Sequence, residues 1–158
     1  MDGDEQRFMK RAIEVSAEKM RALEGGPFGA VIVKDGRIVA EGNNRVTTSN
    51  DPTAHAEVVA IRAACDALGG FSLEGCEIYT SCEPCPMCLA AIYWARLDRL
   101  YYANTRNDAA AIGFDDDRLF REIAKPMAEQ DLPCARLLGA DALAVFKEWE
   151  TMPDKVPY

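Results

Sequence analysis

Residues 80–88 of the chain read TSCEPCPMC, and residues 53–57, which include the only histidine, read TAHAE. Cys85 and Cys88 have the spacing of a metal-binding Cys-x-x-Cys pair, and Glu57 follows His55 by two residues. One imidazole, two thiolates and a nearby carboxylate are the components of a zinc site that activates water. The sequence therefore predicts a fold that brings these two segments together.

Both segments are expected at the start of a helix. The apolar pattern after the polar loop 47–53 predicts a helix over residues 54–68, with His55 in its first turn. Residues two apart in a regular helix diverge by about 200°, so His55 and Glu57 can flank one small space only at a helix end. A second helix is predicted over residues 84–96, because its first turn tolerates the early prolines. Its dipole favours thiolates at Cys85 and Cys88, the form that binds a metal.

The rest of the chain alternates helices and strands. An amphipathic helix is predicted from Asp4 to about Glu24, and strands are predicted over residues 28–33, 37–42, 76–80 and 98–103, the first two joined at Asp35-Gly36. Beyond residue 104 the pattern predicts helices over 118–125 and 141–149, a short strand over 134–138, and a tail, 151–158, without secondary structure. This alternation predicts an α/β fold with helices on both faces of a sheet.

Composition limits the class of substrate and the compartment. With 158 residues, the chain has the size of one domain, and its formal charge of −8 argues against a broad nucleic-acid-binding surface. A small neutral substrate fits this charge better. Residues 1–5 lack the basic and apolar regions of a secretory signal, so we expect a cytoplasmic protein. In that reducing compartment, six cysteines are expected as ligands or core residues rather than as disulfides.

Two alternatives to a catalytic zinc site remain at this point. Cys82 lies three residues before Cys85 and could close a structural Cys3His site. The thiols could also be core residues without any metal. A closed site would leave Glu57 without a function, whereas a carboxylate beside an open metal site can act as general acid and base.

Five sequence segments carry a resemblance to a known family. His-Ala-Glu followed by Pro-Cys-x-x-Cys is the signature of the cytidine deaminase-like zinc hydrolases. The sequence beyond this signature resembles that of the small bacterial guanine deaminases, from about Phe8 through Asp116 and again at Tyr158. The segments that carry this likeness are GPFGAV at 26–31, NDPTAHAE at 50–57, SCEPCPMC at 81–88, AIYWAR at 91–96 and GFDD at 113–116.

The resemblance implies a three-layer α/β/α fold with a mixed sheet of about five strands, in one domain that covers residues 1–158. It also implies hydrolytic deamination of guanine to xanthine and ammonia, as part of purine catabolism. One zinc per subunit would be held by His55, Cys85 and Cys88, and Glu57 would carry the proton.

The resemblance further implies which residues bind the purine: Asn44, Asp116, Phe28, Trp94 and Tyr158. Asn44 and Asp116 would hydrogen-bond the edge of the base, and Phe28 would stack near it. In that family the C-terminal segment is exchanged within a homodimer and closes the partner's pocket. Residues 151–158 are therefore expected to form such a lid, so that Tyr158, together with Trp94, acts across the dimer interface.

Each of these binding roles has a simpler alternative. Asp116, between Asp115 and Asp117, could belong to an ordinary cluster of first-turn charges before the helix near residue 118. Asn44 could serve only a turn, Trp94 could be a core or interface residue, and the tail could be frayed.

The function also has rivals. The enzyme could deaminate guanosine, another amino-purine or adenosine in transfer RNA, since the core motif is shared among these enzymes. The acidic charge and the lack of a Lys/Arg cluster near the end argue against RNA. A rival of another class is a zinc-stabilised binding protein with a closed Cys3His site.

Overall fold

The computed structural model describes residues 3–114 and 116–158, and the chain divides into two compact units, Met1–Leu119 and Phe120–Tyr158. Asp115, which forms part of the 113–116 motif and of the acidic cluster discussed above, lies outside the described residues. Within the described ranges, no helix is both long enough and apolar enough to cross a membrane.

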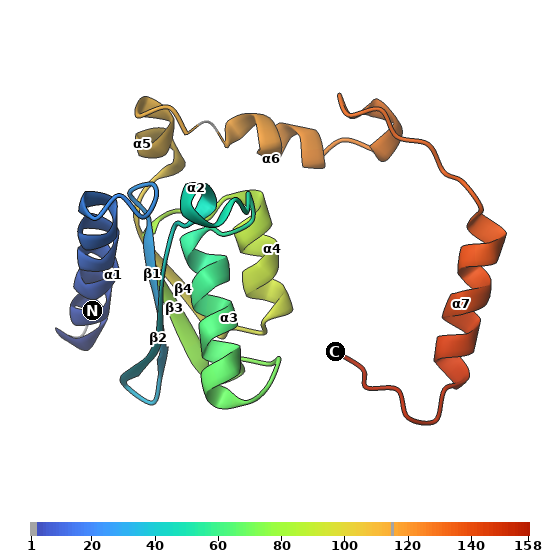
Figure 1. Ribbon diagram of the computed structural model, residues 1–158, viewed down its shortest axis with the longest axis horizontal. Helices are drawn as coiled ribbons and strands as arrows, with labels where there is room; N and C mark the ends of the chain where they lie inside the picture. Colours follow the sequence, from blue (N-terminus) through green and yellow to red (C-terminus); the bar gives the residue numbers. More distant parts are fainter. Residues whose placement is uncertain (1–2, 115) are drawn as a thin grey trace. The chain divides into compact units, whose positions relative to one another are not determined.

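The first unit is built around a four-stranded mixed sheet in the order β2-β1-β3-β4 (Figure 1). Strand β1 pairs antiparallel with β2 and with β3, whereas β3 pairs parallel with β4. Asp35 and Gly36, both at positive φ, form the turn between β1 and β2, which confirms the predicted hairpin. The four strands are β1 (Gly29–Lys34), β2 (Arg37–Asn43), β3 (Cys76–Cys82) and β4 (Arg99–Asn104).

Helices cover both faces of this sheet. Helix α1 (Gly3–Arg21) lies on one face, and helices α3 (Ala56–Leu68) and α4 (Pro86–Trp94) lie on the other (Figure 1). Successive side chains of β1 point to opposite faces of the sheet. Because helices cover both faces, the strand is buried on both sides. Ile32 packs in the cluster that includes Ala60 of α3, and Val31 packs in the cluster that includes Phe8 of α1. The predicted α/β/α layering is thereby confirmed.

The end of β2 lies in backbone contact with the start of α3. A Cβ atom added to Gly42 would lie 2.2 Å from the carbonyl oxygen of Ala56 and 2.5 Å from the nitrogen of Ala60. Only a residue without a side chain permits this approach. It fixes the first turn of α3, and with it His55, against the end of the central sheet.

The two helices that carry the motif begin later than the sequence pattern predicts. His55 is the N-cap of α3 and Cys85 is the N-cap of α4, and both have extended backbone conformations. Pro86 then occupies the first position of α4, where its missing N–H group costs nothing. Both motif segments therefore end at a helix N-terminus, as expected, but His55 and Cys85 lie just outside the helical turns.

Two short helices were not predicted. Helix α2 (Val46–Ser49) lies in the segment expected to be a loop, and helix α5 (Arg106–Ala111) follows β4. Four or six residues are too few to display a helical apolar period. The start of α5 is nevertheless marked by a capping box between Thr105 and Asp108.

The C-terminal part of the chain contains α6 (Asp117–Ile123), the 3-10 turn η1 (Met127–Glu129) and α7 (Gly139–Thr151). These bounds confirm the helices predicted over 118–125 and 141–149. The strand predicted over 134–138 was wrong: this segment pairs with no strand of the described chain, so the sheet has four strands rather than about five. A strand exists only with a hydrogen-bonding partner, which an apolar pattern cannot guarantee. No residue of Phe120–Tyr158 is buried, so this unit has no core of its own.

Candidate active site

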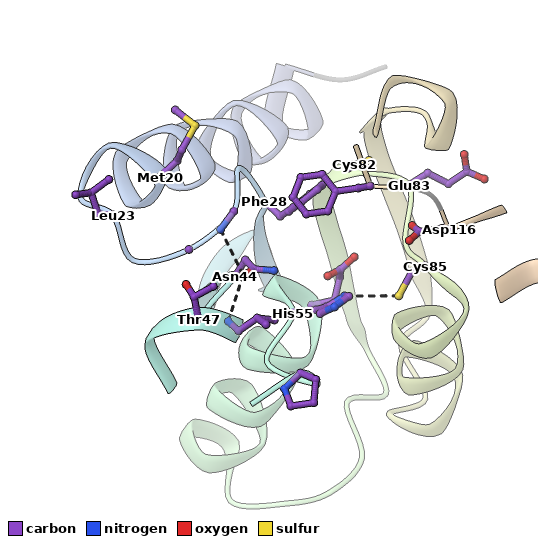
Figure 2. A pocket seen from close by; sticks show the side chains of 16 residues that line it. Met20, Leu23, Phe28, Asn44, Thr47, His55, Cys82, Glu83, Cys85 and Asp116 are labelled. Carbon is purple, nitrogen blue, oxygen red and sulfur yellow. Dashed lines mark hydrogen bonds between the residues drawn. The ribbon is translucent and has the colours of Figure 1, made fainter. Parts of the chain in front are cut away.

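Three potential metal ligands converge between the N-termini of α3 and α4. The ligand atoms of His55, Cys85 and Cys88 lie within 4.8 Å of one another. The distance from Nδ1 of His55 is 3.6 Å to Sγ of Cys85 and 3.4 Å to Sγ of Cys88. Figure 2 shows the imidazole of His55, at the start of α3, facing the thiol of Cys85, at the start of α4. The fold therefore assembles the predicted ligand set.

These separations fit zinc. Tetrahedral zinc, bound to imidazole nitrogen at about 2.0–2.1 Å and to thiolate sulfur at about 2.3 Å, places such ligand atoms about 3.6 Å apart. Cys85 is suited to bind as a thiolate, since hydrogen bonds from Cys88 and His55 lower its pKa to about 4. The hydrogen bond with Cys85 and then burial raise the pKa of Cys88. These shifts favour a thiolate at Cys85 and a thiol at Cys88, whose proton a bound metal would displace.

Glu57 lies in the first turn of α3, beside this ligand set. The residue is only 8% exposed and lines the same pocket as His55 and Cys85. Burial raises the pKa of its carboxyl above the ordinary value. This direction suits a group that must accept a proton and return it.

A pocket of about 590 Å3 opens onto the ligand set. Its walls come from the end of α1, the loop before β1, the end of β2, and the segment between β3 and α4 (Figure 2). Met20 and Leu23 form an apolar rim of the pocket, which the helical apolar pattern alone does not distinguish from the core face of the first helix. The pocket is large enough for a small heterocycle beside the metal centre.

Asn44 presents a hydrogen-bond donor to this pocket. Its Oδ1 accepts hydrogen bonds from the backbone N–H groups of Gly26 and Val46, at 3.4 and 3.2 Å. Because backbone N–H groups only donate, they fix the orientation of the amide. Within the described ranges, every fully buried side-chain nitrogen or oxygen has a hydrogen-bond partner. No hydrogen bond is found for Nδ2 of Asn44. This group is therefore not fully buried and faces the open space of the pocket. Figure 2 shows it on the side of Phe28 and His55.

Two aromatic rings and a carboxylate form the opposite part of the pocket. Phe28 and Phe114 meet edge to face, with their ring centroids 4.8 Å apart. Asp116 also lines the pocket and points inward near Cys85 (Figure 2). The structure therefore brings Phe28, Asn44 and Asp116 to one cavity, as predicted. Phe114 was not identified as a site residue, although it lies in the quoted motif 113–116 and its aromatic ring was the available signal.

Two predicted binding residues are not brought to this pocket within the first unit. Trp94 lies at the end of α4, is 63% exposed and does not line the cavity. Tyr158 belongs to the second unit and is 79% exposed. Their roles in binding stay predictions.

Cys82 is not part of the ligand group. Its Sγ atom lies 3.7 Å from the carbonyl oxygen of Thr105, and the ligand group found within the described ranges contains only His55, Cys85 and Cys88. Burial is the main reason why the pKa of Cys82 rises to about 11, so this thiol stays protonated near neutral pH. This geometry favours a three-ligand site, with the fourth position available, over a closed Cys3His site.

Comparisons with known proteins agree with this geometry. A guanine deaminase of Bacillus subtilis (strain 168) is 54% identical over 151 residues, which cover 96% of this chain and 97% of the relative. A solved structure of guanine deaminase from Bacillus subtilis superimposes with a TM-score of 0.95 at 52% identity, covering 100% of this chain and 99% of that one. A tRNA-specific adenosine deaminase of Agrobacterium fabrum is 50% identical over 95 residues, 60% of this chain and 62% of the relative.

The family model for the cytidine and deoxycytidylate deaminase zinc-binding region matches residues 2–104, which contain all three ligands and Glu57. The matched range thus includes every residue of the candidate metal site. The chain therefore belongs to the zinc-dependent deaminases of the cytidine and deoxycytidylate deaminase family.

Proposed function

We propose that this protein is a zinc-dependent aminohydrolase that converts guanine and water to xanthine and ammonia. The observation that carries this assignment is the 54% identity to a guanine deaminase along 96% of the chain. The likeness to the tRNA-specific enzyme covers only 60% of the chain. The likeness to the guanine deaminase thus extends through the C-terminal part, beyond the shared zinc-binding region.

The chemistry requires one proton carrier beside the metal. Zinc held by His55, Cys85 and Cys88 would supply a water molecule acidified enough to act as a nucleophile near neutral pH. Glu57 accepts a proton from the water while the oxygen adds to the ring carbon that bears the amine, and it passes this proton to the adjacent ring nitrogen, which takes the electron pair of the ring C=N bond. It then transfers the second proton of the added oxygen to the amine nitrogen, so the carbon–nitrogen bond breaks, ammonia leaves and the carbonyl group of xanthine forms. The burial of Glu57 strengthens these transfers, because the site is screened from bulk water.

The pocket residues complement a purine in polarity. The fixed Nδ2 group of Asn44 donates to a ring nitrogen or carbonyl oxygen, and the carboxylate of Asp116 accepts from a ring N–H. Phe28 packs against the face of the base, and Phe114 holds Phe28 from its edge. Guanine carries both donors and acceptors along its edges, and this arrangement matches them.

An Asn44→Asp variant should raise the KM for guanine by about 10- to 100-fold with little change in zinc content. The carboxylate keeps the acceptor for the two backbone N–H groups but replaces the donor with an acceptor, and an unmatched buried polar group costs about 1–3 kcal/mol. Steady-state ammonia release measures the effect. Asn107→Asp, an exposed substitution on α5, is the matched control. An unchanged KM in Asn44→Asp would remove Asn44 from the binding site.

The substrate itself is tested by ammonia release from a panel. The zinc-loaded protein is offered guanine, guanosine, adenine, cytidine, cytosine and a tRNA anticodon stem-loop. Activity on guanine alone is the expected result. Activity on guanosine or on RNA, with none on guanine, would keep the zinc chemistry and refute the proposed substrate.

We also propose that two copies form a homodimer, in which each C-terminal segment closes the partner's pocket. In support, α7 leaves large apolar side chains exposed, Phe146 by 74% and Trp149 by 44%, and Tyr158 is exposed as well. Such a helix needs an apolar surface to pack against. In this arrangement Tyr158 covers the substrate, and the exposed Trp94 lies at the interface.

Mixing two inactive variants tests this exchange. Tyr158→Ala should lower activity strongly, and so should Glu57→Gln. After unfolding and refolding together, half of the dimers carry one site with both residues intact, so about a quarter of wild-type activity should return. Recovery near zero, or a fully active Tyr158→Ala variant, would contradict the exchange.

The remaining assignments follow the same resemblance. We propose one zinc per subunit, a cytoplasmic location and a place in purine catabolism. All six cysteines are free, which suits a reducing compartment.

A further inference from the structure

Glu83 lies between β3 and α4, in the segment that leads to the metal ligand Cys85, and connects this segment to helix α5. Its carboxylate oxygen Oε2 accepts the backbone N–H of Arg106 at 3.0 Å, and its own N–H donates to the carbonyl of Asn104 at 2.8 Å. Figure 2 shows the carboxylate turned away from His55 and Cys85. Although Glu83 lines the pocket, its charged group is used for contact with another element rather than for the cavity.

The contact satisfies a group that α5 cannot satisfy by itself. Arg106 is the first residue of α5, and the N–H groups of a first helical turn have no partner within the helix. The capping box of Thr105 and Asp108 provides partners for two other N–H groups at this end. Glu83, from a different element, provides the partner for the N–H of Arg106.

The C-terminal end of α5 determines the position of Phe114, which forms one wall of the pocket together with Asp116. The N–H of Phe114 donates to the carbonyl of Ala109 at 3.0 Å, so Phe114 is held to the last turn of α5. Phe114 contacts Phe28 edge to face, and Asp116 follows two residues later. A shift of α5 therefore moves the wall that receives the base.

We propose that Glu83 is a positioning residue, which couples the segment between β3 and α4 to the pocket wall formed by Phe114 and Asp116, through α5. Zinc orders the segment that contains Cys85, two residues after Glu83, and Glu83 transmits that order to α5. The consequence for substrate affinity rests on the proposed function, whereas the coupling between zinc and α5 does not. The residue acts through α5 and does not contact the base.

Hydrogen–deuterium exchange of the full chain, with and without zinc, tests the coupling directly. In the wild-type protein, zinc should slow exchange of the amides of residues 106–114. Glu83→Gln should preserve this response, because its amide oxygen still accepts from Arg106. Glu83→Ala should abolish it while zinc still protects the start of α4. An equal response in Glu83→Ala and wild type would overturn the proposal.

Kinetics separates positioning from ordinary helix capping. Glu83→Ala should raise the KM for guanine about 10-fold with zinc content retained and kcat within about threefold, since small displacements of binding groups weaken substrate positioning. Asp108→Ala removes the capping box but leaves the Glu83–Arg106 contact, so it should lower thermal stability and leave KM within about twofold. If both variants raise KM equally, Glu83 is only a cap and the inference fails. A wild-type protein inactive on guanine would refute the substrate alone, since the exchange experiment still decides the coupling.

Discussion

A Glu57→Gln variant should keep its zinc and lose about 10²- to 10⁴-fold in kcat. Glutamine has nearly the same shape and can still form hydrogen bonds, but it cannot accept a proton. General acid–base catalysis by a positioned group contributes about this range, and Glu57 is the carboxylate next to the ligand set in the first turn of α3. The comparison requires kcat from ammonia release and zinc content from metal analysis of the same preparation.

Glu77→Gln is the matched control for this variant. Glu77 lies on β3, where its carboxylate accepts a hydrogen bond from the hydroxyl of Tyr79 at 2.9 Å. A glutamine there keeps an acceptor and changes the net charge by the same amount, so kcat should stay close to that of the wild type. Wild-type turnover in Glu57→Gln would show that the proton moves by another route and would refute the proposed mechanism.

The second large effect is expected from a pair of cysteine substitutions. Cys85→Ser should weaken zinc binding by at least about 100-fold and abolish deamination, because changes even to groups that only support metal ligands cost about 10- to 100-fold in affinity. Cys82→Ser should keep both zinc and activity, since Sγ of Cys82 faces the carbonyl of Thr105 instead of the ligand group. Competition with a chromogenic chelator measures zinc affinity, and Cys134→Ser is the exposed control.

This pair distinguishes a catalytic from a structural metal site. If Cys82→Ser lost zinc as completely as Cys85→Ser, a fourth sulfur ligand would be present, and the position needed by water would be closed. Retention of zinc by Cys82→Ser, together with full turnover, would support the three-ligand site.

The contrast between Glu57 and Asp116 explains why some site residues were easier to predict than others. Glu57 lies within two residues of His55, so a short motif specifies both. Asp116, Asn44 and Phe28 come from three separate segments, and the sequence alone left an alternative for each of the first two. The cavity that they share with His55 supplies the missing information. Phe114 was missed because its place in the pocket depends on its edge-to-face contact with Phe28, which a short motif does not reveal.

The helices and strands, like the site residues, were predictable where the signal lies within one continuous stretch of sequence. Helices α1, α3 and α4 and the four strands were predicted, because their apolar periods extend over enough residues to be recognised. The starts of α3 and α4 were placed too early, since a cap residue such as His55 belongs to the motif but not to the helix. Helix α5 was too short for its period to be read, and the strand predicted over 134–138 lacked a partner.

The sequence by itself indicated the class of chemistry of this protein. The types and spacing of His55, Glu57, Cys85 and Cys88 resemble the signature of zinc-dependent deaminases, because ligand type and motif spacing are properties of the sequence. Only the tertiary structure decided which groups face the pocket: the amide of Asn44 is turned by backbone N–H groups of Gly26 and Val46, and Glu83 is directed to α5 instead of the cavity. These orientations depend on hydrogen bonds between segments distant in sequence, and such contacts exist only after the chain has folded.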